Sequence, residues 1–302
     1  KMNTKIYFNN ENFIGGITLK NEEELEKNNM ALHVCENPEN VVKNREQLAQ
    51  QLKMELQFFV CANQTHSANV YKVTSEDRGR GALSKDNAIP NTDALYTTES
   101  NITLCTFTAD CVPVIFYNHK SGIIGVIHSG WQGTVKEITR KVFEHIREVE
   151  NCDIEEFQVY LGPAISQEKF EVDEDVFVKF KNLGYADEFI YYNDETNKYH
   201  IDNQKTVKKQ CELSGIPSKN ISIDSTCTYR SPQGFSYRED KKCGRHLSFV
   251  MKKCIKAHLP LRDVLFLLKS ICLYSDCFQF FFNLFIFKLS TFKNTSSSFW
   301  SI

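Results

Sequence analysis

The sequence predicts a mixed-sheet α/β or α+β fold. Segments with the apolar pattern of strands interleave with segments whose apolar residues recur at helical spacing. Several expected strand pairs are joined by short turns, which suit antiparallel neighbours rather than a pure series of β-α-β units. The chain has 302 residues, enough for one large domain or two small ones, and it shows no internal repeat.

The first part of the chain is expected to hold three strands, a helix and a long loop. The strands are residues 5–8, 13–18 and 57–61. The helix covers residues 41–54, where Val41, Leu48 and Leu52 have helical spacing. Residues 74–91 are rich in Gly, Asp, Ser and Lys, so a surface loop is expected there, and loops of that length often carry function.

The same mixture continues to about residue 255. Strands are expected at residues 102–107, 112–117, 123–127, 158–161, 189–192, 198–201 and 221–224. Helices are expected at residues 134–148, 173–180, 204–213 and 245–255. The helix at 134–148 has one apolar and one charged face, so it should lie on a sheet.

Charge and cysteine content narrow the class of protein. The net charge is −2, so neither a nucleic acid nor an anionic membrane is expected as a partner. The eleven cysteines are an odd number without regular spacing and form no CxxC pair, which favours reduced thiols over disulfides or a zinc finger. The first residues are polar and lack the apolar core of a signal peptide, so a cytoplasmic protein is expected.

The last 45 residues differ in character from the rest. Residues 258–302 contain no Gly and nine of the 23 Phe. Their most apolar run, residues 277–287, has 11 residues, whereas a membrane-spanning helix needs about 20. We therefore expect residues 1–257 to form the domain and residues 258–302 to be an apolar, Phe-rich tail outside it, with a membrane anchor as the less favoured alternative.

Cys111 and His128 are the first candidates for function, because each lies at the end of an expected strand beside polar or Gly-rich sequence. Singly, such residues are usually core groups. With His66, in a turn after another strand, they can supply three zinc ligands and leave a fourth position for water. The spacings of 45 and 17 residues exclude a local finger. Cys105 is the nearest candidate for a fourth ligand, although a core role suits it better.

Two segments around these residues resemble the signature of a known family. TADCVPV at residues 108–114 and HSGWQGT at residues 128–134 are similar to the laccase-domain, or YfiH-type multicopper polyphenol oxidase, family. This family often has Arg where the chain has Gln132. Further matching pieces occur in order between residues 5 and 255: QTH (64–66), DALYT (93–97), LGPAI (161–165), FEV (170–172), CT (227–228), FSYR (235–238) and GR (244–245).

The resemblance implies a fold, a metal and an activity. The fold is a single α+β domain of mixed β-sheets flanked by helices, related to the catalytic domain of cytotoxic necrotising toxins. The metal is zinc, held at His66, Cys111 and His128. The activity is cleavage of adenosine, inosine, guanosine or methylthioadenosine with phosphate, together with deamination of adenosine. The oligomeric state, monomer or dimer, stays open.

The family name can be tested against the chemistry. A multicopper laccase needs a blue copper and a trinuclear cluster, hence many histidines, including His-x-His pairs. The chain has eight histidines and no His-x-His. Copper is therefore less favoured than zinc, which can lower the pKa of bound water to about 7 and promote attack on C6 of adenine.

Residues around the three candidate ligands are assigned supporting roles. Asp110 can orient a ligand or shuttle a proton, or it can simply cap a strand end or pair with an arginine. The turn from Ser129 through Gly130, Trp131 and Gln132 precedes a helix, so its N–H groups can hold phosphate, although Gly there can also serve the turn alone. Arg238 and Arg245 are candidates for added positive charge, and Trp131 and Tyr237 for stacking on a purine; structural roles are common for all four.

Two other functions remain open. In a metal-free Cys–His hydrolase or amidase, Cys111 is the nucleophile and His128 the base, acting on a small metabolite or a cell-wall precursor. In a non-catalytic partner protein, zinc only stabilises the fold, which would need a closed site with four ligands.

Overall fold

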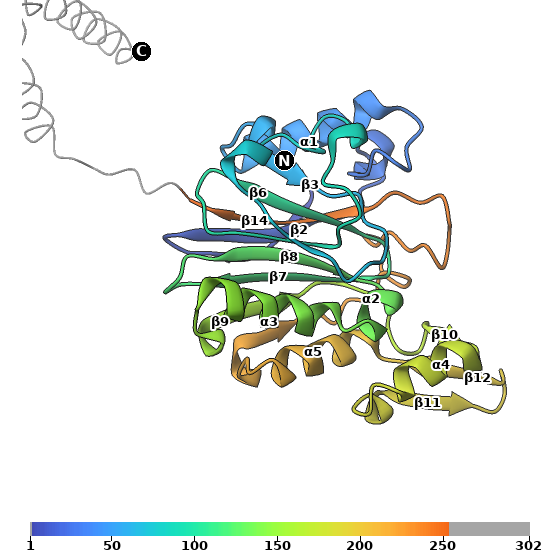
Figure 1. Cartoon of the computed structure of the whole chain (residues 1–302). Helices are drawn as coiled ribbons and strands as arrows, with labels where there is room; N and C mark the ends of the chain where they lie inside the picture. Colours follow the sequence, from blue (N-terminus) through green and yellow to red (C-terminus); the bar gives the residue numbers. More distant parts are fainter. Residues whose placement is uncertain (1, 254–302) are drawn as a thin grey trace, which may run out of the picture. The chain divides into compact units, whose positions relative to one another are not determined.

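The computed structural model of the chain describes residues 2–253, shown in colour in Figure 1. The tail expected at residues 258–302 lies outside the described residues. Within residues 2–253, no helix combines the length and apolarity needed to cross a membrane. The α+β class is confirmed: these residues form two large mixed sheets, a small third sheet and a few helices.

The first large sheet has five strands in the order β1-β2-β14-β6-β3. Its strands pair antiparallel except β3 and β6, which run parallel. The strands are β1 (Thr4–Asn9), β2 (Phe13–Thr18), β14 (His246–Lys252), β6 (Thr103–Thr108) and β3 (Phe59–Cys61).

The second large sheet has six strands in the order β13-β9-β7-β8-β5-β4. Parallel pairs at both edges flank antiparallel pairs in the middle. The strands are β13 (Ile221–Ile223), β9 (Phe157–Leu161), β7 (Val112–Asn118), β8 (Ile124–Ser129), β5 (Ala94–Thr97) and β4 (Val70–Lys72).

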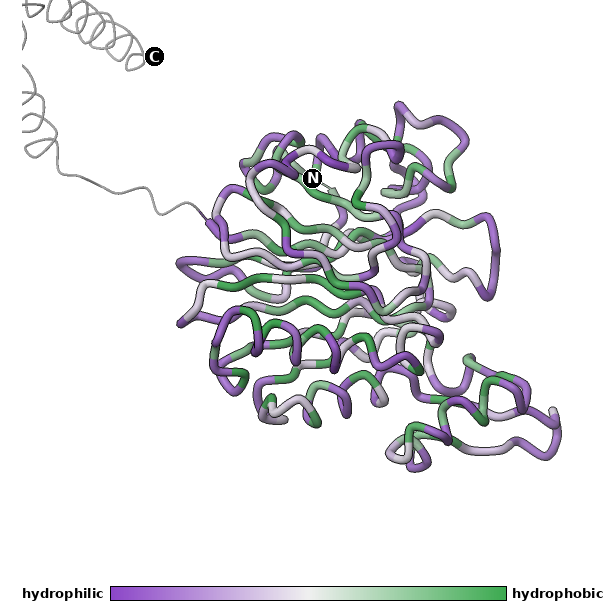
Figure 2. Tube along the Cα trace, in the orientation of Figure 1, coloured by the Kyte–Doolittle hydropathy of each residue, from purple (hydrophilic) through white to green (hydrophobic). Residues whose placement is uncertain are grey.

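The two large sheets pack face to face, with helices on both outer faces (Figure 1). Between the sheets, one apolar cluster joins Val250 and Leu104 of the first sheet to Ile115 and Val126 of the second. Helix α1 (Pro38–Gln51) covers the first sheet, and helices α3 (Ile138–Glu150) and α5 (Asn203–Leu213) cover the second. The hydropathy of the trace follows these layers: the strands and the inner faces of the helices are the most apolar parts in Figure 2.

A small lobe lies beside the helices that cover the second sheet (Figure 1). It holds a three-stranded sheet of β10 (Glu171–Val172), β12 (Lys198–Ile201) and β11 (Ile190–Asn193), with helix α4 (Glu174–Lys181). The remaining elements are the short helix α2 (Trp131–Val135) and 3-10 turns at Leu25–Asn28, Leu56–Phe58, Ser75–Asp77, Lys85–Asn87, Ile154–Glu156, Asp187–Phe189 and Ser218–Asn220.

The helix predicted at residues 245–255 is wrong, because His246–Lys252 forms β14, which lies between β2 and β6. Its side chains alternate, with Phe249 in the cluster under α1 and Val250 in the cluster between the sheets. Both faces of this middle strand are buried, so its apolar residues run together, and periodicity alone does not separate such a run from a buried helix.

The helix predicted at residues 134–148 is divided in the structure. Helix α2 ends at Val135 and α3 begins at Ile138, because Glu137 between them has a left-handed backbone (φ 59°). The loop expected at residues 74–91 is confirmed; it contains two 3-10 turns and an isolated bridge from Ile89 to Ala62. Strands β4, β5 and β10 were not predicted. Each has four residues or fewer, which is too short for a clear pattern.

Candidate metal centre

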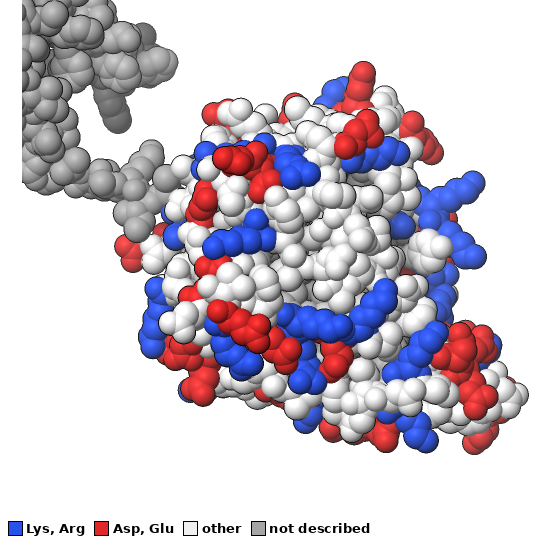
Figure 3. Space-filling model, in the orientation of Figure 1, with Lys and Arg blue, Asp and Glu red and all other residues white. Residues whose placement is uncertain are grey.

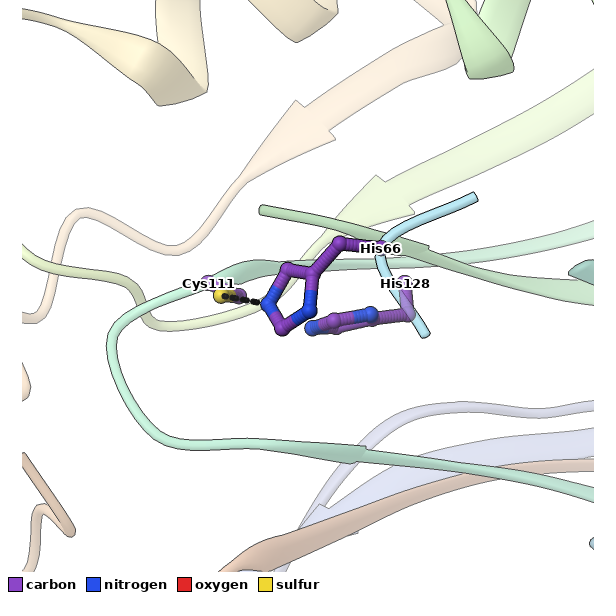
Figure 4. Close-up of side chains that lie close together, drawn as sticks. All are labelled: His66, Cys111 and His128. Carbon is purple, nitrogen blue, oxygen red and sulfur yellow. Dashed lines mark hydrogen bonds between the residues drawn. The ribbon is translucent and has the colours of Figure 1, made fainter. Parts of the chain in front are cut away.

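The predicted trio of His66, Cys111 and His128 comes together in the structure, as Figure 4 shows. One ligand atom from each residue lies within 4.8 Å of the other two. Cys111 Sγ lies 3.9 Å from His66 Nε2, and the two imidazole rings are 4.8 Å apart at 68°. His128 is buried, whereas the other two are half-buried.

The second sheet and one glycine create this proximity. Strands β7 and β8 pair antiparallel with Val112 opposite Ser129. Cys111, directly before β7, therefore lies beside the last residues of β8. A Cβ at Gly130 would lie 2.8 Å both from Cys111 Sγ and from His66 Cδ2. Glycine at position 130 therefore leaves the space in which the His66 ring approaches the thiol.

Asp93 is a site residue to which the sequence analysis gave no role. Its fully buried side chain lies 2.8 Å from His128 Nδ1 and also accepts the backbone N–H groups of Thr65, His66 and Ser67. The available signal was an aspartate directly before a fully buried strand, within the DALYT motif. A buried carboxylate needs several donors, so such a position indicates a polar network.

The charges of the site are coupled. Burial acts to raise the pKa of the Cys111 thiol, but His128 and His66 outweigh it and lower that pKa to about 6. Burial acts to lower the pKa of His128, but Cys111 and Asp93 raise it to about 9. The metal-free trio is therefore a thiolate beside an imidazolium, and the sulfur is already in the form that binds a metal.

The donor set fits a soft or borderline metal ion. In tetrahedral zinc sites with usual bond lengths, a sulfur and a nitrogen ligand lie about 3.6 Å apart, close to the 3.9 Å between Cys111 and His66. Imidazole and thiolate suit zinc, and two His with one Cys also occur in copper sites. Cys105 does not join the trio: it lies opposite Cys61 in the apolar cluster under α1.

Asp110, next to Cys111 in the sequence, holds a loop. Its carboxylate accepts hydrogen bonds from Thr228 Oγ1 (2.7 Å), Ser236 Oγ (3.0 Å) and the Arg238 N–H (2.7 Å). Its own backbone has φ 82°, a conformation that L-residues rarely adopt. Asp110 thus ties residues 228–238 to the segment that presents Cys111.

The turn after β8 lies beside the trio. Ser129 is buried and its hydroxyl hydrogen-bonds that of Thr134 (2.9 Å). Gly130 caps α2, which has only five residues and hence a weak dipole. Trp131 and Gln132 are half-buried on its first turn, and Trp131 packs against the small lobe, with Lys179 Nζ 5.2 Å from its ring.

Arg238 and Arg245 are both engaged with backbone carbonyls. The Arg238 guanidinium donates to the carbonyls of Lys169 and Glu171, each at 3.1 Å. The Arg245 guanidinium donates to the Gly244 carbonyl at 3.0 Å and stacks 5.6 Å from the Tyr237 ring. On the face drawn in Figure 3, basic and acidic residues are interspersed, in keeping with the small net charge.

Two cavities lie along residues 224–234 rather than at the trio. The larger, of about 420 Å³, is open and is lined by polar residues that include Ser166, Cys227 and Arg230. The smaller, of about 70 Å³, lies beside Asp224 and Thr228. No trio residue lines either cavity.

Comparison with known proteins gives one consistent result. Residues 15–253 match the family model described as multi-copper polyphenol oxidoreductase laccase. Purine nucleoside phosphorylase YlmD of Bacillus subtilis is 36% identical over 251 residues, which cover 81% of this chain and 90% of the relative. The crystal structure of the Bacillus licheniformis hypothetical protein YfiH superposes with a TM-score of 0.76 at 32% identity, covering 80% and 93% of the two chains. YlmD from Geobacillus stearothermophilus superposes with the same TM-score at 30% identity, covering 80% and 92%.

Proposed function

Because this chain belongs to the multi-copper polyphenol oxidoreductase laccase family, we propose that it is a zinc-dependent purine nucleoside phosphorylase that also deaminates adenosine. The similar relatives carry the name purine nucleoside phosphorylase. The observation that carries the proposal is the trio of His66, Cys111 and His128, of which the first two are half-buried. The proposed substrates are phosphate and the nucleosides adenosine, inosine, guanosine and methylthioadenosine. A cytoplasmic location stays a prediction.

The trio would hold zinc through Cys111 Sγ and the Nε2 atoms of His66 and His128. His128 has only Nε2 available, because its Nδ1 is bonded to Asp93. Three protein ligands leave the fourth position for water or substrate. When bound, zinc would supply Lewis-acid polarisation and activation of water near neutral pH.

Asp110 is proposed to orient the site. Three donors occupy its carboxylate, which favours this role over a proton shuttle. By fixing the backbone immediately before Cys111, it holds the thiolate at the start of β7. The proton-shuttle role stays a prediction that an Asn substitution can test.

Phosphate is proposed to bind near the turn after β8. The residues assigned to it are Ser129, Gly130, Trp131 and Gln132, with charge from Arg238 and Arg245. The backbone of this turn adjoins the trio, because a Cβ added at Gly130 would lie 2.8 Å from both Cys111 Sγ and His66 Cδ2. Either arginine would have to exchange a carbonyl partner for the anion, so phosphate binding should reorder the 228–245 segment.

The donor residues do not fit a multicopper oxidase, which requires several further histidines close to one another. Within residues 2–253, the other buried histidines contact residues that do not belong to the trio. His246 lies between the Thr18 carbonyl and the Phe235 N–H, and His200 stacks on Tyr191. The family description therefore names copper chemistry that this chain's residues do not support.

A second candidate function is favoured by one observation. Cys111, His128 and Asp93 stand in the order nucleophile, base and orienting carboxylate, which is the arrangement of a thiol hydrolase. A metal-free hydrolase or amidase acting on a small metabolite or cell-wall precursor thus stays an alternative. A non-catalytic zinc protein is less favoured, since the trio offers three ligands rather than a closed set of four.

One set of measurements separates these functions. The full chain is purified, its bound metal is measured, and turnover of inosine and adenosine is assayed with and without phosphate. We expect phosphate-dependent cleavage of inosine, and loss of metal and of turnover in His66→Ala. Activity that survives chelation but disappears with iodoacetamide would support the thiol hydrolase. No turnover of any nucleoside would exclude the phosphorylase.

A further inference from the structure

A single carboxylate serves two of the three candidate ligands. Asp93 Oδ1 lies 2.8 Å from His128 Nδ1 and 3.1 Å from the backbone nitrogen of His66. Asp93 Oδ2 accepts the Ser67 hydroxyl (2.6 Å), the Ser67 N–H (2.8 Å) and the Thr65 N–H (3.1 Å). The side chain has no exposed surface. Five donors from two distant parts of the chain therefore converge on one group.

We propose that Asp93 is the positioning residue of the metal centre, fixing the His128 ring and the His66 turn at the same time. The inference rests on the metal site of the proposed function and not on the reaction it performs. Partners behind a metal ligand commonly orient the ligand, and their loss weakens metal binding about 10- to 100-fold.

For His128, the carboxylate selects which nitrogen faces the trio. In the neutral ring that binds a metal, a hydrogen bond from Nδ1 to Asp93 keeps the proton on Nδ1 and leaves the Nε2 lone pair for the metal. The backbone strengthens this hold, because the His128 N–H donates to the carbonyl of Asp93 at 2.7 Å. His128 thus lies in β8, and Asp93 directly precedes β5, the strand that pairs with β8.

For His66, the carboxylate holds an unfavourable backbone. His66 has φ 57°, in the left-handed region that a residue with a side chain seldom adopts. Its N–H is held by Asp93 and its carbonyl accepts Lys136 Nζ at 2.6 Å, so the peptide groups on both sides are fixed. Without the carboxylate, the three N–H groups of residues 65–67 would lose their acceptor. The left-handed backbone of the turn would then no longer be stabilised.

Asp93→Asn in the full chain tests the proposal by zinc affinity, measured in competition with a chelator. We expect affinity to fall about 10- to 100-fold, because the amide presents an NH2 group to donors that need acceptors. Asp77→Asn is the matched control. Asp77 is also a buried carboxylate with several donors, among them Thr74 N–H (2.9 Å) and Arg80 (3.0 Å), but it lies in the 74–91 loop. The control should lower stability and leave zinc affinity unchanged.

The second readout is the imidazole nitrogen NMR spectrum of the metal-free chain. Wild type should show a His128 Nδ1–H signal shifted by its hydrogen bond to Asp93, and Asp93→Asn should change that signal, whereas Asp77→Asn should not. This readout also separates the proposals: a wild-type chain that binds no metal would defeat the proposed function, while the His128 signal still reports on Asp93.

Several outcomes would overturn the inference. One is a folded Asp93→Asn chain whose zinc affinity stays within about twofold of wild type, and another is an equal loss of affinity in Asp77→Asn. If Asp93→Asn does not fold, Ser67→Ala removes the 2.6 Å bond to Oδ2, together with the 3.2 Å bond from the exposed Asn69 N–H to the Ser67 hydroxyl. This variant should bind zinc a few-fold more weakly, and unchanged binding there would also overturn the proposal.

Discussion

Gly130 and Cys111 are so close that a single added carbon would collide with the thiol. A Cβ built on Gly130 lies 2.8 Å from Cys111 Sγ, well inside the usual contact distance. Position 130 therefore sets the space for the ligand sulfur as well as the start of α2.

Gly130→Ala should impair metal binding more than folding. The methyl group would displace the Cys111 thiol or the His66 ring, so zinc affinity should fall at least about tenfold, with a loss of about 1–3 kcal/mol in unfolding free energy. Gly133→Ala, within α2, is the control, because its Cβ would press only on Ile138 Cγ2 at 3.3 Å and would meet the His128 and Ser67 carbonyl oxygens at ordinary contact distances of 3.6 and 3.7 Å. Chelator competition and urea unfolding measure the two effects. Equal zinc affinity in both variants would contradict the prediction.

Removal of metal should expose Cys111 to alkylation. Its pKa of about 6 means that the thiolate dominates at pH 7, so iodoacetamide should modify it rapidly. Cys227, half-buried and with a lowered pKa, should also react, whereas burial raises the pKa of Cys211 and keeps it inert. Peptide mass spectrometry with and without zinc gives the test. Zinc should protect Cys111 and leave Cys227 reactive, and equal protection of both would count against the site.

Asp110→Ala should loosen the loop that Asp110 holds. Three hydrogen bonds disappear, so stability should fall by about 2–4 kcal/mol and proteolysis should increase within residues 228–245. Asp110→Asn separates this from a proton shuttle. A shuttle predicts a large loss of kcat with stability unchanged, whereas the orienting role predicts that activity and loop protection decline together. Thr228→Val, which removes one of the three bonds, should give a smaller loss.

His246 should make the fold sensitive to acid. Burial lowers its pKa to about 4, because the ring is enclosed with Nδ1 against the Thr18 carbonyl and Nε2 accepting the Phe235 N–H. Between pH 6.5 and 4 the unfolded chain binds the proton and the folded chain does not, so stability falls as the pH falls through this range. The change from pH 7 to 4 should approach about 3 kcal/mol. Urea unfolding should show a flatter profile in His246→Gln, and an unchanged slope would contradict this assignment.

The sequence predicted the trio but not the group that orients it. Cys111 and His128 were visible because each lies at the end of an apolar run, and His66 because it lies in a polar turn after another expected strand. Asp93 precedes β5, a strand of four residues, and its partners at positions 65–67 and 128 are joined to it only by the folded sheets. A contact between segments about 30 residues apart leaves no local pattern in one sequence.

Among the helices and strands too, local sequence patterns allowed prediction, whereas features that depend on distant packing were missed. Amphipathic segments such as α3 were recognisable from apolar spacing, and buried central strands such as β7 from apolar runs. The break at Glu137 and the strand state of β14 depend on what packs around them. β14 is apolar on both sides because α1 covers one face and the second sheet the other.

The position of β14 also constrains the order in which the chain can fold. The hairpin of β1 and β2 reaches β6 only through β14, whose residues are made about 140 positions after β6. Until residues 246–252 leave the ribosome, the edges of β2 and β6 that pair with β14 have no partner strand. These edges can then pair with other chains instead. Strand pairs this far apart in sequence form slowly, so we expect the first sheet to be completed last during synthesis. Binding of chaperones to the nascent chain should be greatest just before that step.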